Sequence, residues 1–150
     1  MISLNNYVKK RNGVPLGHSN SLSNMFKRSL GANSFDLFWI HWNPIWNYYL
    51  NKYIYKPLKR VCHSYVALVL TFGFSGFVHD LAGLLIYTEL SFLFTIWFII
   101  MGVLAAVFKR NKIYYKTQKK EVNYGFNVIL IVSSFLLAKC ILNGIYFFNT

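Results

Sequence analysis

Apolar and polar positions divide the chain into a polar start and a series of long apolar runs. Three runs, at residues 61–87, 91–108 and 126–148, are about long enough to cross a bilayer, since roughly 20 apolar residues span its hydrocarbon core. The pattern predicts helices because a helix satisfies its backbone hydrogen bonds internally. The first run is longer than one crossing needs, so it predicts a helix that is tilted, or broken near Gly73, Gly76 or Gly83.

The stretch from Phe35 to Tyr55 is strongly aromatic but interrupted. Asn33 or Ser34 is placed to cap a helix, and Pro44 must kink that helix or begin a new one because it has no backbone N–H. Tryptophan and tyrosine favour the headgroup level of a membrane. The stretch therefore predicts a pair of short interfacial or re-entrant helices, with one aromatic face formed by Trp39, Trp42, Trp46, Tyr49 and Tyr53.

The polar start predicts one short helix. Residues 1–20 are rich in turn residues and predict a cytoplasmic lead-in. Residues 21–30 carry apolar positions at helical spacing, with Gly31 as the expected end. The predicted fold class is all-α, a polytopic membrane protein with three to four transmembrane helices plus the aromatic helix pair. We expect the lead-in with its amphipathic helix at residues 1–33 and the helical membrane domain at residues 34–150.

Composition and charge support a membrane protein. The chain is 55% hydrophobic and only 13% charged, against roughly 25% in an average soluble domain. Its net charge of +12 does not indicate nucleic-acid binding, because the lysines and arginines lie at the ends of apolar runs, as cytoplasmic anchors do. Their distribution predicts a multi-pass protein (of the inner or plasma membrane, if bacterial) with a cytoplasmic N-terminus and 109–121 loop. Glu89 and the C-terminus are expected on the other side.

Cysteine and histidine spacing gives no signal for a metal. We interpret Cys62 and Cys140 as buried free thiols, since they lie in or beside apolar runs without ligand spacing. His41, His63 and His79 do not have the spacing of a metal site either.

The first candidate for chemistry is His79, which precedes Asp80 late in an apolar run. Hydrocarbon solvates neither group, so ionisable residues at such positions are functional candidates. Thr71 and Ser75 precede His79 by eight and four positions and therefore share its helix face. Such a polar stripe must face protein or trapped water. Asp80 is placed to orient or charge-stabilise His79, although neighbouring residues on a helix point about 100° apart.

Asn43 is the second candidate. An imidazole is the usual group for taking a proton near neutral pH, and an amide N–H can hold an oxyanion. His79 and Asn43 together suit acyl transfer to a hydroxyl. Alternatives remain open: Asn43 before Pro44 is also a good helix cap, and His79 is also explained as a packing histidine or a pore residue.

Two blocks of this sequence resemble the membrane-bound O-acyltransferase superfamily. The first is Phe38-Trp39-x-x-Trp42-Asn43, followed by Trp46 and by Tyr53-Ile54-Tyr55-Lys56-Pro57-Leu58. The second is Ser75-Gly76-x-x-His79 in the next apolar run. Members of this family usually have several hundred residues and about ten membrane helices. The chain therefore resembles a short form, or the C-terminal catalytic part, of such a protein.

The resemblance implies that His79 is the catalytic histidine and Asn43 its partner. It implies transfer from a thioester, often acyl-CoA, to a lipid, glycan, sterol or protein hydroxyl, with no cofactor besides these substrates. Expected substrate contacts are Trp39, His41, Trp42, Trp46, Ser75 and Asp80. The expected partners are the lipid bilayer and a second copy or another membrane subunit, because three or four helices enclose little space. The alternative function is a non-enzymatic helical membrane protein, either a truncated family remnant or a subunit of a larger complex.

Overall fold

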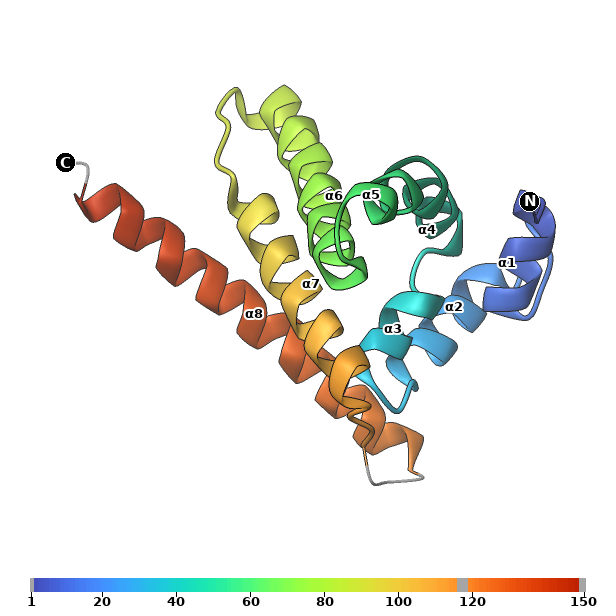
Figure 1. Cartoon of the computed structure of the whole chain (residues 1–150). Helices are drawn as coiled ribbons and strands as arrows, with labels where there is room; N and C mark the ends of the chain where they lie inside the picture. Colours follow the sequence, from blue (N-terminus) through green and yellow to red (C-terminus); the bar gives the residue numbers. More distant parts are fainter. Residues whose placement is uncertain (1, 116–118, 149–150) are drawn as a thin grey trace.

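The computed structural model describes residues 2–115 and 119–148, which form helices joined by short turns (Figure 1). This part of the chain contains no strand, so the all-α class is confirmed. The elements are α1 (Leu4–Asn12), α2 (Ser21–Leu30), α3 (Phe35–His41), α4 (Pro44–Leu50), the π-helical turn η1 (Asn51–Tyr55), α5 (Lys56–Val61), α6 (Ser64–Tyr87), α7 (Leu93–Asn111) and α8 (Lys120–Phe148).

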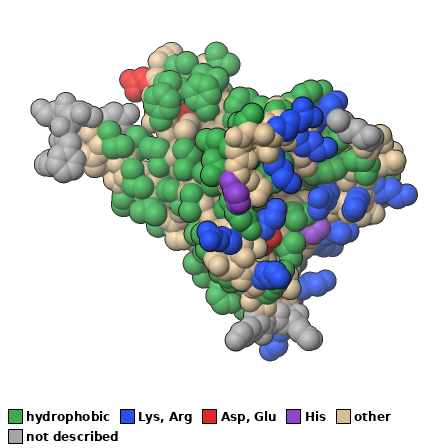
Figure 2. All heavy atoms as spheres, viewed as in Figure 1, with side chains coloured by type: hydrophobic (Ala, Val, Ile, Leu, Met, Phe, Trp, Pro, Cys, Tyr) green, Lys and Arg blue, Asp and Glu red, His purple; other side chains and the backbone are tan. Residues whose placement is uncertain are grey.

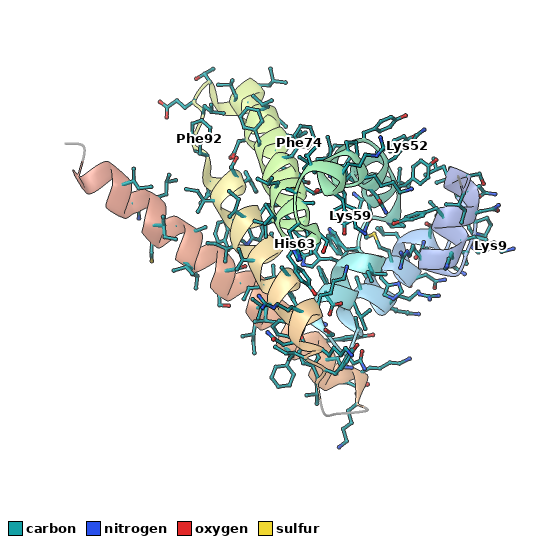
Figure 3. The ribbon with its side chains drawn as sticks, viewed as in Figure 1. Lys9, Lys52, Lys59, His63, Phe74 and Phe92 are labelled. Atoms are coloured by element: carbon teal, nitrogen blue, oxygen red, sulfur yellow. The ribbon has the colours of Figure 1, made fainter. Side chains whose placement is uncertain are left out.

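Three helices are long and apolar enough to cross a membrane. Their spans are Ser64–Ile86, Leu93–Asn111 and Lys120–Ile145, which confirms the three runs expected from the hydropathy pattern. Helix α6 is continuous through all its glycines. His63 and Phe92 mark opposite ends of the antiparallel α6–α7 pair (Figure 3).

Glycines set the close packing of α6 against α7. A methyl group added at Gly76 would come within 2.8 Å of the Cα atom of Thr95, and one at Gly102 within 2.8 Å of the Cβ atom of Phe72. Real carbon atoms do not approach so closely, so a larger residue at either position would push the two helices apart. Gly76 therefore lets the backbone of α7 approach α6 closely.

The aromatic stretch is broken into short helices, as its sequence predicts. Helix α3 ends at His41, and α4 begins at Pro44, whose ring occupies the first helical position. Between them Asn43 has a φ of 37° in the left-handed region, which asparagine tolerates better than most residues. Phe35 and Phe38 of α3 are almost fully buried and pack with α7 in the main apolar cluster. Whether α3 and α4 are interfacial or re-entrant stays a prediction.

Helix α1 was not expected from the sequence, which predicts only a turn-rich lead-in there. Ser3 caps its start and Gly13, with a φ of 84°, ends it. The Tyr7 hydroxyl donates a 3.0 Å hydrogen bond to Oδ1 of Asn47, which fixes α1 against α4. Helix α2 ends at Gly31, as predicted, and Asn20 is the residue that precedes its start.

Helix α8 is attached through buried polar side chains. Nδ2 of Asn127 donates to the carbonyl oxygens of Leu30 and Ala32, at 2.8 and 2.9 Å, and so holds the α2–α3 turn. Nε1 of Trp97 donates to the Ser134 hydroxyl at 3.0 Å, which links α7 to α8. Hydrophobic side chains cover the side formed by α7 and α8 (Figure 2). Lysines and arginines gather over the short helices and near the end of α7, whose last turn contains Lys109 and Arg110.

Candidate active site

A cavity of about 270 Å³ lies between the short helices and the α6–α7 pair. It follows α6 from Leu68 to His79, about 16 Å of helix. Most of the residues singled out in the sequence line it together: Trp39, Trp42, Asn43, Trp46, Ser75 and His79. Thr71 lines it as well, so the whole polar stripe of α6 faces one space. The fold therefore brings the two sequence blocks to a single cavity.

His79 is held in a defined tautomer. Its Nδ1 lies 2.6 Å from the backbone carbonyl oxygen of Ser75. A carbonyl only accepts hydrogen bonds, so Nδ1 carries the proton and Nε2 keeps a lone pair. The Phe98 ring, with its centroid 5.0 Å from that of the imidazole, packs against the side chain. His79 itself is exposed in this chain, so a reacting group has access to it.

Ser75 connects the two blocks. Nε1 of Trp46 donates a 2.9 Å hydrogen bond to the Ser75 hydroxyl, while the Ser75 carbonyl accepts the bond from His79. Ser75 is 3% exposed and Trp46 is half-buried, so breaking the bond would leave the Ser75 hydroxyl with little compensation from water. One residue thus ties α4 to the imidazole.

Asn43 caps α4, as one of the two sequence interpretations expects. Its Oδ1 accepts a 3.1 Å hydrogen bond from the backbone N–H of Trp46. The cap uses only the oxygen of the amide, and Asn43 also lines the cavity. The NH₂ group of the same side chain is therefore the end that can donate to a ligand. Capping and ligand binding do not exclude each other here.

Asp80 lies outside the cavity wall. It is 2% exposed, and its carboxylate accepts hydrogen bonds from the backbone N–H groups of Phe94 and Thr95, at 3.0 and 2.7 Å, and from the Thr95 hydroxyl at 2.6 Å. The first N–H groups of a helix lack partners within it. Asp80, on α6, is the acceptor for these N–H groups of α7. Phe92, which precedes α7, makes no side-chain cap.

His41 is also outside the cavity wall. Its Nδ1 lies 2.8 Å from the backbone carbonyl oxygen of Arg11, so α3 is joined to the end of α1. Burial is the main cause that lowers the pKa of His41, the hydrogen bond opposes it, and the charges of Arg28 and Arg11 lower it further. The neutral imidazole is thus favoured, with Nδ1–H donating to the carbonyl.

Sequence reasoning missed part of the wall. The additional polar and charged residues lining the cavity are Tyr7, Arg11, Asp36, Asn47, Asn51, Tyr55 and Lys109. Asn47 follows Asn43 by one helical turn, and this spacing was a signal for a shared face. Nothing local in the sequence places α1 against α4. The wall crosses the expected boundary at residues 33 and 34, since α1 and α6 both contribute to it.

Metal-ligand and thiol chemistry have little support at this site. Within residues 2–115 and 119–148, no three histidine, cysteine, aspartate or glutamate side chains are grouped to hold a metal ion. The cysteines are free, as expected, but only Cys62 is half-buried. Cys140 is exposed on α8 instead of buried, because it lies on a face of that helix that no other part of the described chain covers.

Comparison with known proteins identifies the family of this chain. No curated protein and no solved structure gives a significant match to the chain. A family model described as MBOAT, membrane-bound O-acyltransferase family, matches residues 12–147. That match contains both sequence blocks and all three apolar spans of a multi-pass membrane protein. The chain therefore belongs to the membrane-bound O-acyltransferase family.

Proposed function

We propose that the protein transfers an acyl group from a thioester donor to a hydroxyl acceptor, with His79 as general base and Asn43 as the donor to the carbonyl oxygen. Family membership supports acyl transfer in a membrane. The assignment of these two residues is supported by their position on one cavity. Acyl-CoA and other acyl thioesters are the donors that suit this chemistry, and no cofactor takes part in it.

The reaction is a proton-coupled substitution at the thioester carbonyl. Nε2 of His79 removes the acceptor hydroxyl's proton as its oxygen forms a bond to the carbonyl carbon. The carbonyl oxygen becomes an oxyanion, which accepts a hydrogen bond from the NH₂ group of Asn43. The carbon–sulfur bond then breaks, and the departing thiolate takes the proton from the imidazolium of His79. The products are the O-acyl ester and the free thiol.

The observation that carries this proposal is the hydrogen bond between Nδ1 of His79 and the carbonyl of Ser75. This bond leaves Nε2 as the only basic ring nitrogen, and it fixes the ring plane in the cavity. The exposure of His79 and its place on the wall favour a reacting group.

Aromatic side chains supply the apolar part of the wall. Trp39, Trp42 and Trp46 line the cavity beside Leu68 and Phe98. Indole rings bury large apolar areas while their N–H groups bind acceptors. We propose that these three tryptophans contact the acyl chain, with Ser75 holding Trp46 in place. His41 and Asp80 act on neighbouring helices, through their bonds to α1 and α7.

The functional form includes further protein around the cavity. His79 is exposed in this chain although it lies well inside a membrane span, and an exposed imidazole is unfavourable against hydrocarbon. A second copy of the chain or another membrane subunit would cover it. This partner stays a prediction.

The decisive experiment is the turnover of membrane-inserted His79→Ala. We expect transfer to fall by about 10²–10⁴-fold, the contribution of a general base, when free thiol released from acyl-CoA is measured with candidate hydroxyl acceptors. His63→Ala is the matched control, since His63 lies at the start of α6 outside the cavity wall. Turnover of His79→Ala within a few-fold of wild type would remove His79 from the mechanism. Absence of transfer by the wild type would favour the non-enzymatic subunit.

A further inference from the structure

Arg11 is a cation in the cavity wall that its own chain does not satisfy. It lies in the last turn of α1, and its side chain lines the cavity. Its Nε atom is buried and has no hydrogen-bond partner. The guanidinium carbon lies 5.3 Å from the centroid of the Tyr7 ring, a contact that orients the group but accepts no hydrogen bond.

The chain offers Arg11 no carboxylate. It has only four acids for 16 lysines and arginines. Asp80 is engaged on α7, and Asp36, which does line the cavity, accepts a hydrogen bond from the Ser34 hydroxyl. Glu89 and Glu121 do not contribute to the wall. No carboxylate in the described part of the chain forms an ion pair with Arg11, which leaves the guanidinium available to an anionic ligand.

Two further groups in the same wall point to an anion. The indole Nε1 of Trp39 is buried without a partner, and Trp39 lines the cavity. An unpaired buried donor is unfavourable, because it has lost its water and gained nothing. Lys109, from the basic end of α7, adds a second cation to the wall. Arg11, Trp39 and Lys109 thus contribute two unpaired N–H donors and two positive charges to the wall, against the single carboxylate of Asp36. This balance favours an oxygen acceptor that carries negative charge.

Arg11 is also held in place from outside the cavity. The 2.8 Å hydrogen bond from Nδ1 of His41 ends on the backbone carbonyl of Arg11 itself. Carbonyl groups in the last turn of a helix lack partners within it. His41 provides one, and this fixes the backbone from which the guanidinium projects. Arg11 is therefore pre-organised, which lowers the entropic cost of binding a ligand.

We propose that Arg11 is the anion-recognition residue of the cavity, binding a phosphate carried by one of the two substrates. This inference rests on the proposed function, because it assigns a subsite of the same cavity. Guanidinium binds such groups through a fork of N–H donors. The charge comes either from the carrier of the thioester donor or from the headgroup of a lipid acceptor. Arg11 selects the substrate, and His79 reacts with it.

Two probes separate these sources. Coenzyme A represents a phosphorylated donor carrier, dodecyl phosphate represents a lipid headgroup, and dodecanol is the neutral match for the latter. Binding to the purified protein in neutral detergent is followed by tryptophan fluorescence, since three tryptophans line the cavity. We expect Arg11→Gln to weaken binding of at least one phosphate probe by about tenfold or more. Binding of dodecanol should be unchanged.

Matched variants make the result specific. Lys10→Gln removes one exposed positive charge from the same helix and should leave both affinities at the wild-type level. Arg11→Lys should give intermediate affinity, because it keeps the charge but loses the fork, and it decides the matter if Arg11→Gln does not fold. If only coenzyme A binds more weakly to the Arg11 variants, Arg11 recognises the phosphate of the donor. If only dodecyl phosphate binds more weakly, Arg11 recognises the headgroup of the acceptor. If both bind more weakly, Arg11 recognises a phosphate group on either molecule.

Two results would overturn the proposal. Unchanged affinities for both phosphate probes in a folded Arg11 variant would show that the guanidinium binds neither. An equal loss in Lys10→Gln would mean a general effect of net charge. Probe binding is measured without acyl transfer, so a failure of the proposed catalysis, seen as wild-type turnover in His79→Ala, is distinguished from a failure of anion binding.

Discussion

Trp46 and Ser75 join the two halves of the candidate active site through a single hydrogen bond of 2.9 Å. The indole comes from α4, the helix that Asn43 caps, and the hydroxyl comes from α6, one turn before His79. Because the carbonyl of Ser75 also accepts the bond from His79, the positions of amide and imidazole are coupled through one buried residue.

Ser75→Ala should lower turnover by between a few-fold and about 100-fold, since small misplacements of reacting groups have effects of that size. Its unfolding free energy should fall by only about 1 kcal/mol, the contribution of one hydrogen bond. Trp46→Phe should behave alike, and the double variant should resemble either single one. Turnover in detergent and thermal unfolding measure the two effects. Ser133→Ala, on an exposed α8 serine, is the control, and wild-type turnover in Ser75→Ala would show that the link is not needed.

Asn43→Asp separates the cap from the chemistry. Aspartate caps as well as asparagine does and tolerates the left-handed backbone, so stability should change by less than about 0.5 kcal/mol. Turnover should fall by about 10²–10³-fold, because a carboxylate cannot donate to an oxyanion and repels it. The comparison is turnover against thermal unfolding of the same preparation. If the variant keeps most of its activity, Asn43 is a helix cap only.

Asp80→Ala should unfold the α6–α7 pair more readily. The variant leaves the Phe94 and Thr95 donors without their acceptor, at a cost of at least about 2 kcal/mol because hydrogen bonds to a charged group are strong. Thermal unfolding in mild detergent checks this, with Glu89→Ala as the control at the exposed acid of the same end. Loss of turnover at an unchanged unfolding temperature would instead place Asp80 in the reaction, as a partner of His79 or of the substrate.

Acid should destabilise the protein through His41. Its folded-state pKa is lowered from the ordinary value of 6.5, mainly by burial. Above that value both folded and unfolded states hold the neutral ring, so the neutral contact is fully present. As the pH falls below 6.5, the unfolded state takes up the proton first, and stability is lost progressively until the pH has passed the lowered pKa of the folded state. Unfolding temperatures at about pH 7.5 and about pH 5.5 should differ more in wild type than in His41→Asn. Equal differences would rule out His41 as the titrating group.

Labelling from outside intact cells tests the topology. Single cysteines are introduced as Glu89→Cys or Tyr114→Cys in a Cys62→Ala/Cys140→Ala background. An impermeant thiol reagent should label Glu89→Cys and leave Tyr114→Cys unlabelled. The reason is the charge asymmetry around the apolar runs, and both positions are exposed. Tyr114 is preferred to Tyr115, which hydrogen-bonds to Asn127 through its hydroxyl. Strong labelling at Tyr114→Cys alone would invert the predicted orientation.

The sequence by itself determined the features that depend on neighbouring residues. Helical spans follow from runs of apolar residues, and the break before α4 follows from Pro44, which lacks an N–H. The shared face of Thr71, Ser75 and His79 follows from the helical period. The capping of α4 by Asn43 was one of two interpretations, since a cap is a contact over three residues.

The tertiary structure alone decided which helices meet. Asp80 follows His79 directly, yet it turns to α7, because the uncapped N–H groups of that helix lie beside it. Arg11 and Asn47 come from different helices and share a wall with His79 only because α1 packs on α4. Such contacts depend on the shapes of surfaces far apart in the chain, as where Gly76 lets α7 approach. A periodic pattern specifies the face of a helix, but the partner of that face is chosen by packing.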